Sequence, residues 1–269
     1  MTAPTGNPHE IVCGAIETVS AIYPMVEEFH QVYGHPVRLN TLTSSLLKLR
    51  GNLIGEESRR EGIGALDEKN LTKFLDAIGD AAYVEVGSLV AMKGGLEHAL
   101  AEPSDSTYME ICGILTDTLT PQSLSMVMMF SGWLGDGFTL MAECEDRETV
   151  EEAIPILCSG LYISLQAKLC LCRALGIDLV ELVKAIHESN MTKLWPADEQ
   201  QLRDAIAISK YSEEDLCFRV CDSRPGLVGY RKSDGKILKS PDYKSVDLSR
   251  FVAKSAESSL WCAFVDRAL

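Results

Sequence analysis

The helical character of this chain is clearest over residues 42–95, LTSSLLKLRGNLIGEESRREGIGALDEKNLTKFLDAIGDAAYVEVGSLVAMKGG. Leucines recur at spacings of four, three and four, at Leu42, Leu46, Leu49 and Leu53, which is the repeat of an amphipathic helix. The second half of the stretch is apolar on nearly every side, which is typical of a helix that is buried all round. The stretch therefore predicts a hairpin of two packed helices.

The same helical period continues through most of the chain, and runs of alternating β-branched residues are nearly absent, so we predict an all-α fold. The expected helices cover residues 9–33 (bent near Pro24), 41–62, 69–99, 106–119, 122–144, 147–175, 178–189, 197–209 and 246–268, with breaks at Gly34-His35-Pro36, Gly94-Gly95 and Pro103. The exception is 226–243, where Asp234-Gly235 lies between two short extended runs. This segment predicts a β-hairpin or an ordered excursion of the chain.

A weak internal repeat relates the stretch 42–95 to the stretch 122–176. In the alignment, Gly55-Glu56 corresponds to Gly135-Asp136, and 80–83 corresponds to 159–162. The second copy lacks nearly all the acids, and both a true duplication and a chance likeness of two apolar hairpins remain open. In either case we expect a single domain over 1–269, built from the acidic hairpin 42–95, the degenerate hairpin 122–176 and a C-terminal motif segment, 187–243.

Charge and composition narrow the class of partner. The chain has 39 acidic and 25 basic residues and a net charge of −14, and a field of this sign repels nucleic acid. It does not oppose the binding of small phosphates through a divalent metal. We find no long uncharged apolar run and no signal-peptide pattern, and the nine cysteines sit mostly in apolar helical contexts, like free thiols of a reducing compartment. We expect a cytoplasmic protein with no nucleic-acid and no membrane partner.

The first helix of the acidic hairpin ends in three glutamates. Glu57 and Glu61 are four residues apart and stack on one side of a helix, and together with Glu56 they prolong the apolar leucine stripe. Burying carboxylates without a cation is costly, so a positive group should meet them. Arg60 and a divalent metal ion are both candidates, and a solvated helix face is the alternative.

The second helix of the hairpin carries Asp76 and Asp80, again four residues apart, among apolar neighbours. No Lys or Arg occurs over 74–92, so the two aspartates lack a cation close by in sequence. The residues 62–75 that separate Glu61 from Asp76 are enough for a turn and the start of an antiparallel return, so the two acidic pairs can face each other across a helix–helix groove. Carboxylate oxygens in this arrangement suit Mg²⁺, which binds a few carboxylates together with waters and substrate phosphates.

Three separated segments of the chain resemble one known family. They are VEEFHQVYGHPV (26–37), the acidic stretch 49–87, and the region from Gly176 to Tyr243. Its most specific parts are HESNMTK (187–193) and the downstream DGKILKSPDY (234–243). Together the segments are similar to the all-α nucleoside triphosphate pyrophosphohydrolase superfamily, in its MazG-like, phosphoribosyl-ATP-pyrophosphohydrolase-like branch.

The resemblance implies a helical fold with a groove loaded with Mg²⁺, or Mn²⁺ in its place. It implies house-cleaning hydrolysis of an NTP or dNTP between the α- and β-phosphates, which yields the monophosphate and pyrophosphate. It assigns metal binding to Glu57, Glu61, Asp76 and Asp80, and the catalytic role to Glu56 and Glu57. It assigns substrate binding to Phe29, His30, Arg50, Asn190, Lys193, Lys236, Lys239 and Tyr243.

The chain also departs from the family pattern. The usual Glu-Glu-x-x-Glu spacing is one residue longer here, which leaves open which of Glu56, Glu57 and Glu61 bind metal. Subunits of the family pair to form a four-helix core, and the internal repeat suggests that this chain supplies both halves. It is then either a monomer with an internal pseudo-dimer or a homodimer.

Several candidate residues have a structural alternative. Asn190 and Lys193 could cap the helix that precedes them, Lys236 and Lys239 could be solvated hairpin residues, and His30 could be a buried, satisfied histidine. A catalytically degenerate nucleotide-binding or scaffold protein is the alternative to the enzyme. Phosphoribosyl-ATP hydrolysis is a third possibility.

Overall fold

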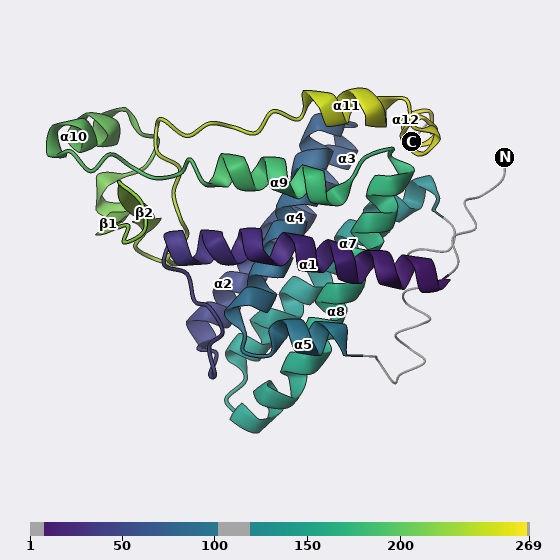
Figure 1. Cartoon of the computed structure of the whole chain (residues 1–269), viewed down its shortest axis with the longest axis horizontal. Helices are drawn as coiled ribbons and strands as arrows, with labels where there is room; N and C mark the ends of the chain where they lie inside the picture. The colour runs from purple at the N-terminus through teal and green to yellow at the C-terminus, as the bar shows by residue number, and fades with distance from the viewer. Residues whose placement is uncertain (1–7, 102–118, 268–269) are drawn as a thin grey trace.

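The computed structural model describes residues 8–101 and 119–267 and shows a helical molecule with one small sheet (Figure 1). The α-helices are α1 (Pro8–Val32), α2 (Ser44–Gly55), α3 (Gly64–Asp67), α4 (Leu71–Ala91), α5 (Gly95–Leu100), α7 (Pro121–Glu143), α8 (Arg147–Ala174), α9 (Leu179–Asn190), α10 (Glu199–Ile208), α11 (Ser249–Ala256) and α12 (Ser259–Val265). A π-helix, η1 (Glu56–Ile63), and a 3₁₀-helix, η2 (Glu213–Asp215), complete the helical elements. The strands β1 (Leu216–Val220) and β2 (Leu227–Arg231) form an antiparallel pair. The predicted all-α class with a small β element is confirmed.

Most helix ends follow local signals in the sequence. Helix α2 begins after Thr43, whose hydroxyl accepts a hydrogen bond from the Leu46 amide, and α4 begins after Asn70, which accepts one from the Lys73 amide. Gly94, with a φ of +71°, separates α4 from α5. The helix expected over 69–99 is therefore two helices, divided at the predicted glycine break. The helix expected over 106–119 lies almost entirely outside the described residues.

The helix expected over 41–62 is not α-helical throughout, because residues Glu56–Ile63 form the π-helix η1. A π-helix bonds each amide to the carbonyl five residues back, so each turn holds about one residue more than an α-turn. The segment coincides with the glutamate motif that is one residue longer than the family spacing. The wider turn absorbs the extra residue and places Glu61 about one turn beyond Glu56.

Two helix hairpins pack against each other to form the core of the molecule. Helices α2, η1 and α4 make the first hairpin, and α7 and α8 make the second. Helices α2 and α7 approach so closely that a Cβ on Gly51 would lie 2.6 Å from the Gly135 carbonyl oxygen. Helices α1 and α9 lie side by side across α4 (Figure 1).

Glu85 on α4 joins the two hairpins through a buried polar network. Its Oε1 accepts hydrogen bonds from Ser131 (2.6 Å), Ser164 (2.8 Å) and Lys168 (2.8 Å). The Lys168 and Glu85 side chains form an ion pair that is wholly buried. Such a network fixes the relative register of the helices because each member depends on the others for its hydrogen bonds.

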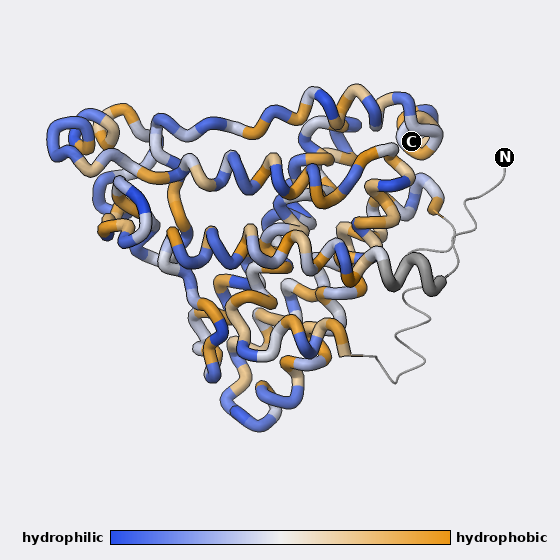
Figure 2. Tube along the Cα trace, in the orientation of Figure 1, coloured by the Kyte–Doolittle hydropathy of each residue, from blue (hydrophilic) through white to orange (hydrophobic). Residues whose placement is uncertain are grey.

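Helix α8 bears on the expectation that the chain has no apolar run long enough to span a membrane. It is long and apolar enough, by length and composition, to cross a membrane, with a mean hydropathy of 1.5 over its best window. The structure buries 67% of that window, and the core helix of a globular protein passes the same test. Figure 2 shows hydrophobic residues recurring along the other bundle helices as well.

A second, smaller core lies under α10 and the two strands. It contains Trp195, Ala205, Leu216 and Leu238, and the Trp195 indole donates a hydrogen bond to the Leu238 carbonyl at 3.1 Å. The predicted turn at 234–235 is present, with an isolated bridge from Tyr230 to Ile237. The ladder partner of β2 is nevertheless β1, which the sequence did not reveal because it is short and lies outside the segment 226–243.

Candidate functional site

A groove runs between η1, α4 and the C-terminal segment. Its larger part is a cavity of about 570 Å³, within the range of roughly 300–1,000 Å³ that is usual for small-molecule sites. An adjoining cavity of about 170 Å³ shares Lys73, Asp76, Asp80, Asn190 and Lys239 with it. Its lining combines aromatic side chains, carboxylates from η1 and α4, and lysines and arginines, several of which come from the C-terminal segment.

Three carboxylates in the groove lack a counter-ion. Glu57, Asp76 and Asp80 are half-buried and form no ion pair with any described residue. Burial raises the pKa of Glu57 and of Asp80, and the repulsion of neighbouring carboxylates raises both further. Burial also raises the pKa of Asp76. Half-buried acids that repel one another are stabilised by a cation placed among them.

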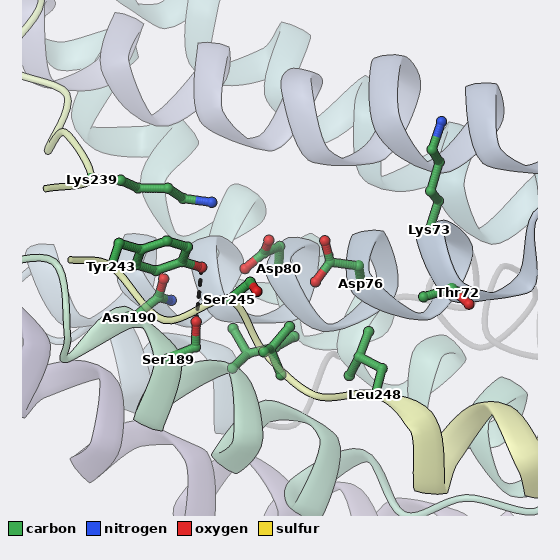
Figure 3. Close-up of a pocket in the computed structure, with 12 residues that line it drawn as sticks. Thr72, Lys73, Asp76, Asp80, Ser189, Asn190, Lys239, Tyr243, Ser245 and Leu248 are labelled. Atoms are coloured by element: carbon green, nitrogen blue, oxygen red, sulfur yellow. Dashed lines mark hydrogen bonds between the residues drawn. The ribbon is translucent and has the colours of Figure 1, made fainter. Parts of the chain in front are cut away.

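Figure 3 shows how α4 presents the two aspartates. The Asp76 and Asp80 carboxylates come from successive turns and lie on the same side of the helix, as their spacing of four residues predicts. The Lys239 ammonium extends toward Asp80 from the opposite wall, while Lys73 points away from the pair. The aspartates therefore face an open space bounded by cationic residues.

The other two glutamates are neutralised by the protein itself. Glu56 forms ion pairs with Arg60 and with Lys236, which lies 180 positions away in the sequence. Burial acts to raise the pKa of Glu56, but Lys236 and Arg60 outweigh it and lower this pKa. Glu61 pairs with Arg60 at 3.0 Å, near the rim. Arg60, one of the two cations expected beside the glutamates, thus pairs with Glu56 and Glu61. It does not pair with Glu57.

The tight turn at 234–235 aims Lys236 into the groove. Gly235 adopts a φ of +74°, and Asp234 accepts hydrogen bonds from the Arg231 side chain (2.9 Å) and the Lys236 amide (3.1 Å). The Arg231 amide also bonds to the Lys236 carbonyl at 2.8 Å. Lys236 is therefore held by the turn and is not a freely solvated hairpin residue.

Lys193 and Lys239 each lie over an aromatic ring. The Lys193 ammonium is 5.5 Å from the centre of the Phe29 ring, and the Lys239 ammonium is 4.3 Å from that of Tyr243. Burial lowers the pKa of Lys193 to about 8, although the Asp80 carboxylate acts in the opposite direction. Lys193 reaches into the groove and does not fold back as a helix cap.

Hydrogen bonds attach the end of α9 to distant parts of the chain. The Tyr33 hydroxyl donates to the Asn190 carbonyl at 3.0 Å, and the Ser189 hydroxyl donates to the Tyr243 hydroxyl at 2.8 Å. The second of these bonds is visible in Figure 3. They place the Asn190 side chain and the Tyr243 ring in the wall opposite α4.

The structure brings all but two of the predicted site residues to this groove. The exceptions are His30 and Arg50, which do not line either cavity. His30 is buried, its Nδ1 lies 2.7 Å from the Pro36 carbonyl oxygen, and burial with the nearby Arg50 lowers its pKa to about 3. It is the satisfied buried histidine of the structural alternative. Arg50 is also buried, and its Nε has no partner among the described residues.

His35 and Tyr83 also line the groove and were not singled out from the sequence. The His35 ring stacks on Phe29 with a centroid distance of 5.9 Å, and Tyr83 meets Phe29 edge to face at 5.6 Å. The Tyr83 hydroxyl lies 2.9 Å from His187 Nδ1. The available signal for His35 was the Gly34–Pro36 turn, because a turn at the end of α1 directs the intervening side chain off the helix axis.

The chemistry of the groove fits a divalent cation. Within 8–101 and 119–267, no group of three or more Asp, Glu, His or Cys side chains lies close enough together to hold a metal ion by itself. Mg²⁺ does not need such a cage, because it binds one or two carboxylates and takes its other ligands from water and phosphates. Glu57, Asp76 and Asp80, which lack counter-ions, are the residues that would hold it.

Comparison with known proteins gives one relative of unknown activity. No family model matches the chain, and no solved structure is significantly similar to it. An uncharacterized protein, L479, of Acanthamoeba polyphaga mimivirus is 28% identical over 244 residues, which cover 84% of this chain and 94% of the viral protein. The similarity thus extends over most of this chain and nearly the whole viral protein.

Proposed function

We propose that this protein is a Mg²⁺-dependent nucleoside triphosphate pyrophosphohydrolase of the all-α, MazG-like type. The observation that carries the proposal is the convergence of two distant parts of the sequence on one groove. Three carboxylates that form no ion pair with any described residue come from η1 and α4, and four lysines, among them Lys193, Lys236 and Lys239, come from the segment 193–239. This is the combination that a metal–triphosphate complex requires, because the metal needs acids and the phosphates need cations.

Each part of the groove has a distinct role in the proposal. Phe29, His35 and Tyr83 form an aromatic part of the lining against which a nucleobase would pack. Lys193, Lys236 and Lys239 would donate hydrogen bonds to phosphate oxygens. When bound, Mg²⁺ would neutralise triphosphate charge and act as a Lewis acid toward the α-phosphate.

Glu57 is the residue best placed to accept a proton from the attacking water. It lies beside Asp80, forms no ion pair with any described residue, and its pKa in the metal-free protein is raised by burial and by its acidic neighbours. Glu56, which is already paired with Lys236, would instead hold that lysine in the groove. Glu61 would have to leave Arg60 before it could bind a metal.

The test is pyrophosphate release from a panel of NTPs, dNTPs and phosphoribosyl-ATP, with Mg²⁺, with Mn²⁺ and with EDTA. We expect release that needs the metal and that Asp80→Asn abolishes. Asp136→Asn is the matched control, because Asp136 occupies the position of Glu56 in the second hairpin but is exposed and paired with Arg59. Nucleotide binding without turnover on any substrate would favour the degenerate binding protein instead.

A further inference from the structure

Helix α7 presents an apolar stripe to solvent. Its exposed positions are Gln122, Met126, Met129, Trp133, Asp136, Leu140 and Glu143. They alternate at spacings of four and three, which is the a/d spacing of a coiled-coil seam. The four apolar members are exposed to 41%, 44%, 59% and 62% in chain order. A seam of this spacing is normally buried against another helix.

The charge of the stripe restricts what can cover it. The chain as a whole carries −14, yet the charged members of the stripe are Asp136, which is paired with Arg59, and Glu143 at its end. The stripe contains no lysine or arginine, whereas helices that lie on membrane surfaces are rich in both. The stripe is therefore suited to another apolar helix and poorly suited to an anionic lipid surface.

The internal repeat accounts for the exposure of this face of α7. In the register that equates Gly55 with Gly135, Met126, Met129 and Trp133 correspond to Leu46, Leu49 and Leu53. In the first hairpin the groove lies on this face, with Leu53 and Glu56 in its wall and Lys236 of the C-terminal segment paired with Glu56. The chain has a single C-terminal segment, so the matching face of the second hairpin is left without one.

Two contacts support this pseudo-symmetry. Gly55 meets Gly135, where an added Cβ would lie 3.1 Å from the Gly55 amide nitrogen. Glu85 meets Ser164, its counterpart in the alignment, at 2.8 Å. Contacts between equivalent positions arise where a two-fold axis passes through an interface.

We propose that the exposed face of α7 is a self-association surface, which packs antiparallel on the same face of a second copy of this chain. The stripe is symmetric about Trp133, because Met126 and Leu140 lie seven residues to either side. A two-fold axis near Trp133 sets Met126 of one copy against Leu140 of the other and brings the two Trp133 rings together. No stripe residue lines the groove, so the dimer leaves the groove open.

The size of the stripe makes this dimer weak. From Met126 to Leu140 the helix rises about 21 Å, and a helix is about 10 Å wide, so the seam offers roughly 200 Å². Stable complexes bury about 800 Å² on each partner. Association should therefore depend on protein concentration over the micromolar range or above.

Sedimentation equilibrium of the full chain over a concentration series tests the proposal. We expect the average mass to rise from monomer toward dimer, and Trp133→Glu or Met129→Glu to hold it at the monomer value. Both side chains are exposed, so the variants should keep the wild-type circular dichroism spectrum. Ile208→Glu on α10 is the control, because Ile208 is 76% exposed but lies outside the stripe; it should associate like the wild type.

Three results would overturn the proposal. They are a wild-type chain that stays monomeric at every concentration, stripe variants that still dimerise, and a monomer that instead binds neutral lipid vesicles through Trp133. The mass measurement needs no nucleotide, so its outcome is independent of whether the groove hydrolyses triphosphates.

Discussion

Replacing Asp80 by asparagine should stabilise the metal-free protein while it abolishes turnover. The asparagine keeps the shape of the side chain and removes a charge that burial and Asp76 both disfavour. One unit of pKa shift corresponds to about 1.4 kcal/mol. We therefore expect the free energy of unfolding to rise by about 1–3 kcal/mol at a pH above the raised pKa.

The raised pKa of Asp80 also determines how the stability gain from Asp80→Asn varies with pH. The native state holds the Asp80 proton more tightly than the unfolded chain does, so the wild-type protein loses stability as pH rises from the ordinary carboxyl range of about 4 through the raised pKa. The gain from Asp80→Asn should accordingly be largest in alkaline buffer and should vanish in acid, where the carboxyl is protonated in both states.

Urea unfolding in EDTA at several pH values measures the effect. The exposed control, Asp136→Asn, loses its ion pair with Arg59 and should be destabilised by about 1 kcal/mol or less. An Asp80→Asn protein that is less stable than the wild type at every pH, or that still releases pyrophosphate at the wild-type rate, would refute the reasoning.

Lys168→Met leaves the buried Glu85 without its cation, so urea unfolding should show a loss of about 3–5 kcal/mol, most of which Glu85→Leu in the same chain restores; equal stability of the single variant and the wild type would contradict this. Burial lowers the pKa of Arg50 to about 10 because its guanidinium has no ion pair among the described residues, so Arg50→Met should raise the stability in thermal or urea unfolding by about 1–3 kcal/mol. Lower stability of that variant would show that Arg50 has a partner. Mg²⁺ binding should release protons, because it favours the charged forms of Glu57 and Asp80, whose pKa values are raised. Calorimetry in two buffers of different ionisation enthalpy measures the release, and identical heats in both would argue against these ligands.

The helical hairpins were predictable because their signals are local. Leucine spacing, the Asn70 cap and the glycine pair at 94–95 mark the helices and their ends without reference to the rest of the chain. The placement of Asp76 and Asp80 on one side of α4 followed from the helical period as well, because residues four apart share one side of any α-helix. These features depend only on residues within a few turns of each other.

The remainder of the site depends on tertiary packing. The period alone could not place Lys236 against Glu56, because that contact is made by a turn 180 positions away. The resemblance to a family assigned both residues to one site but did not predict their ion pair. The period also could not show that His35 lines the groove and His30 does not, because the turn at Gly34 directs the His35 side chain off the helix. The π-helix was signalled by the one extra residue at 56–61, but a spacing anomaly alone does not show how the backbone absorbs it.

In the proposed reaction the groove cleaves a nucleoside triphosphate between its α- and β-phosphates. Phosphorus NMR of a reaction that contains the full chain, Mg²⁺ and the preferred nucleotide tests the claim most directly, because it identifies the bond that breaks. We expect nucleoside monophosphate and pyrophosphate as the first products, with none when EDTA is present. Formation of nucleoside diphosphate and inorganic phosphate, or an unchanged triphosphate spectrum across the whole panel, would contradict it.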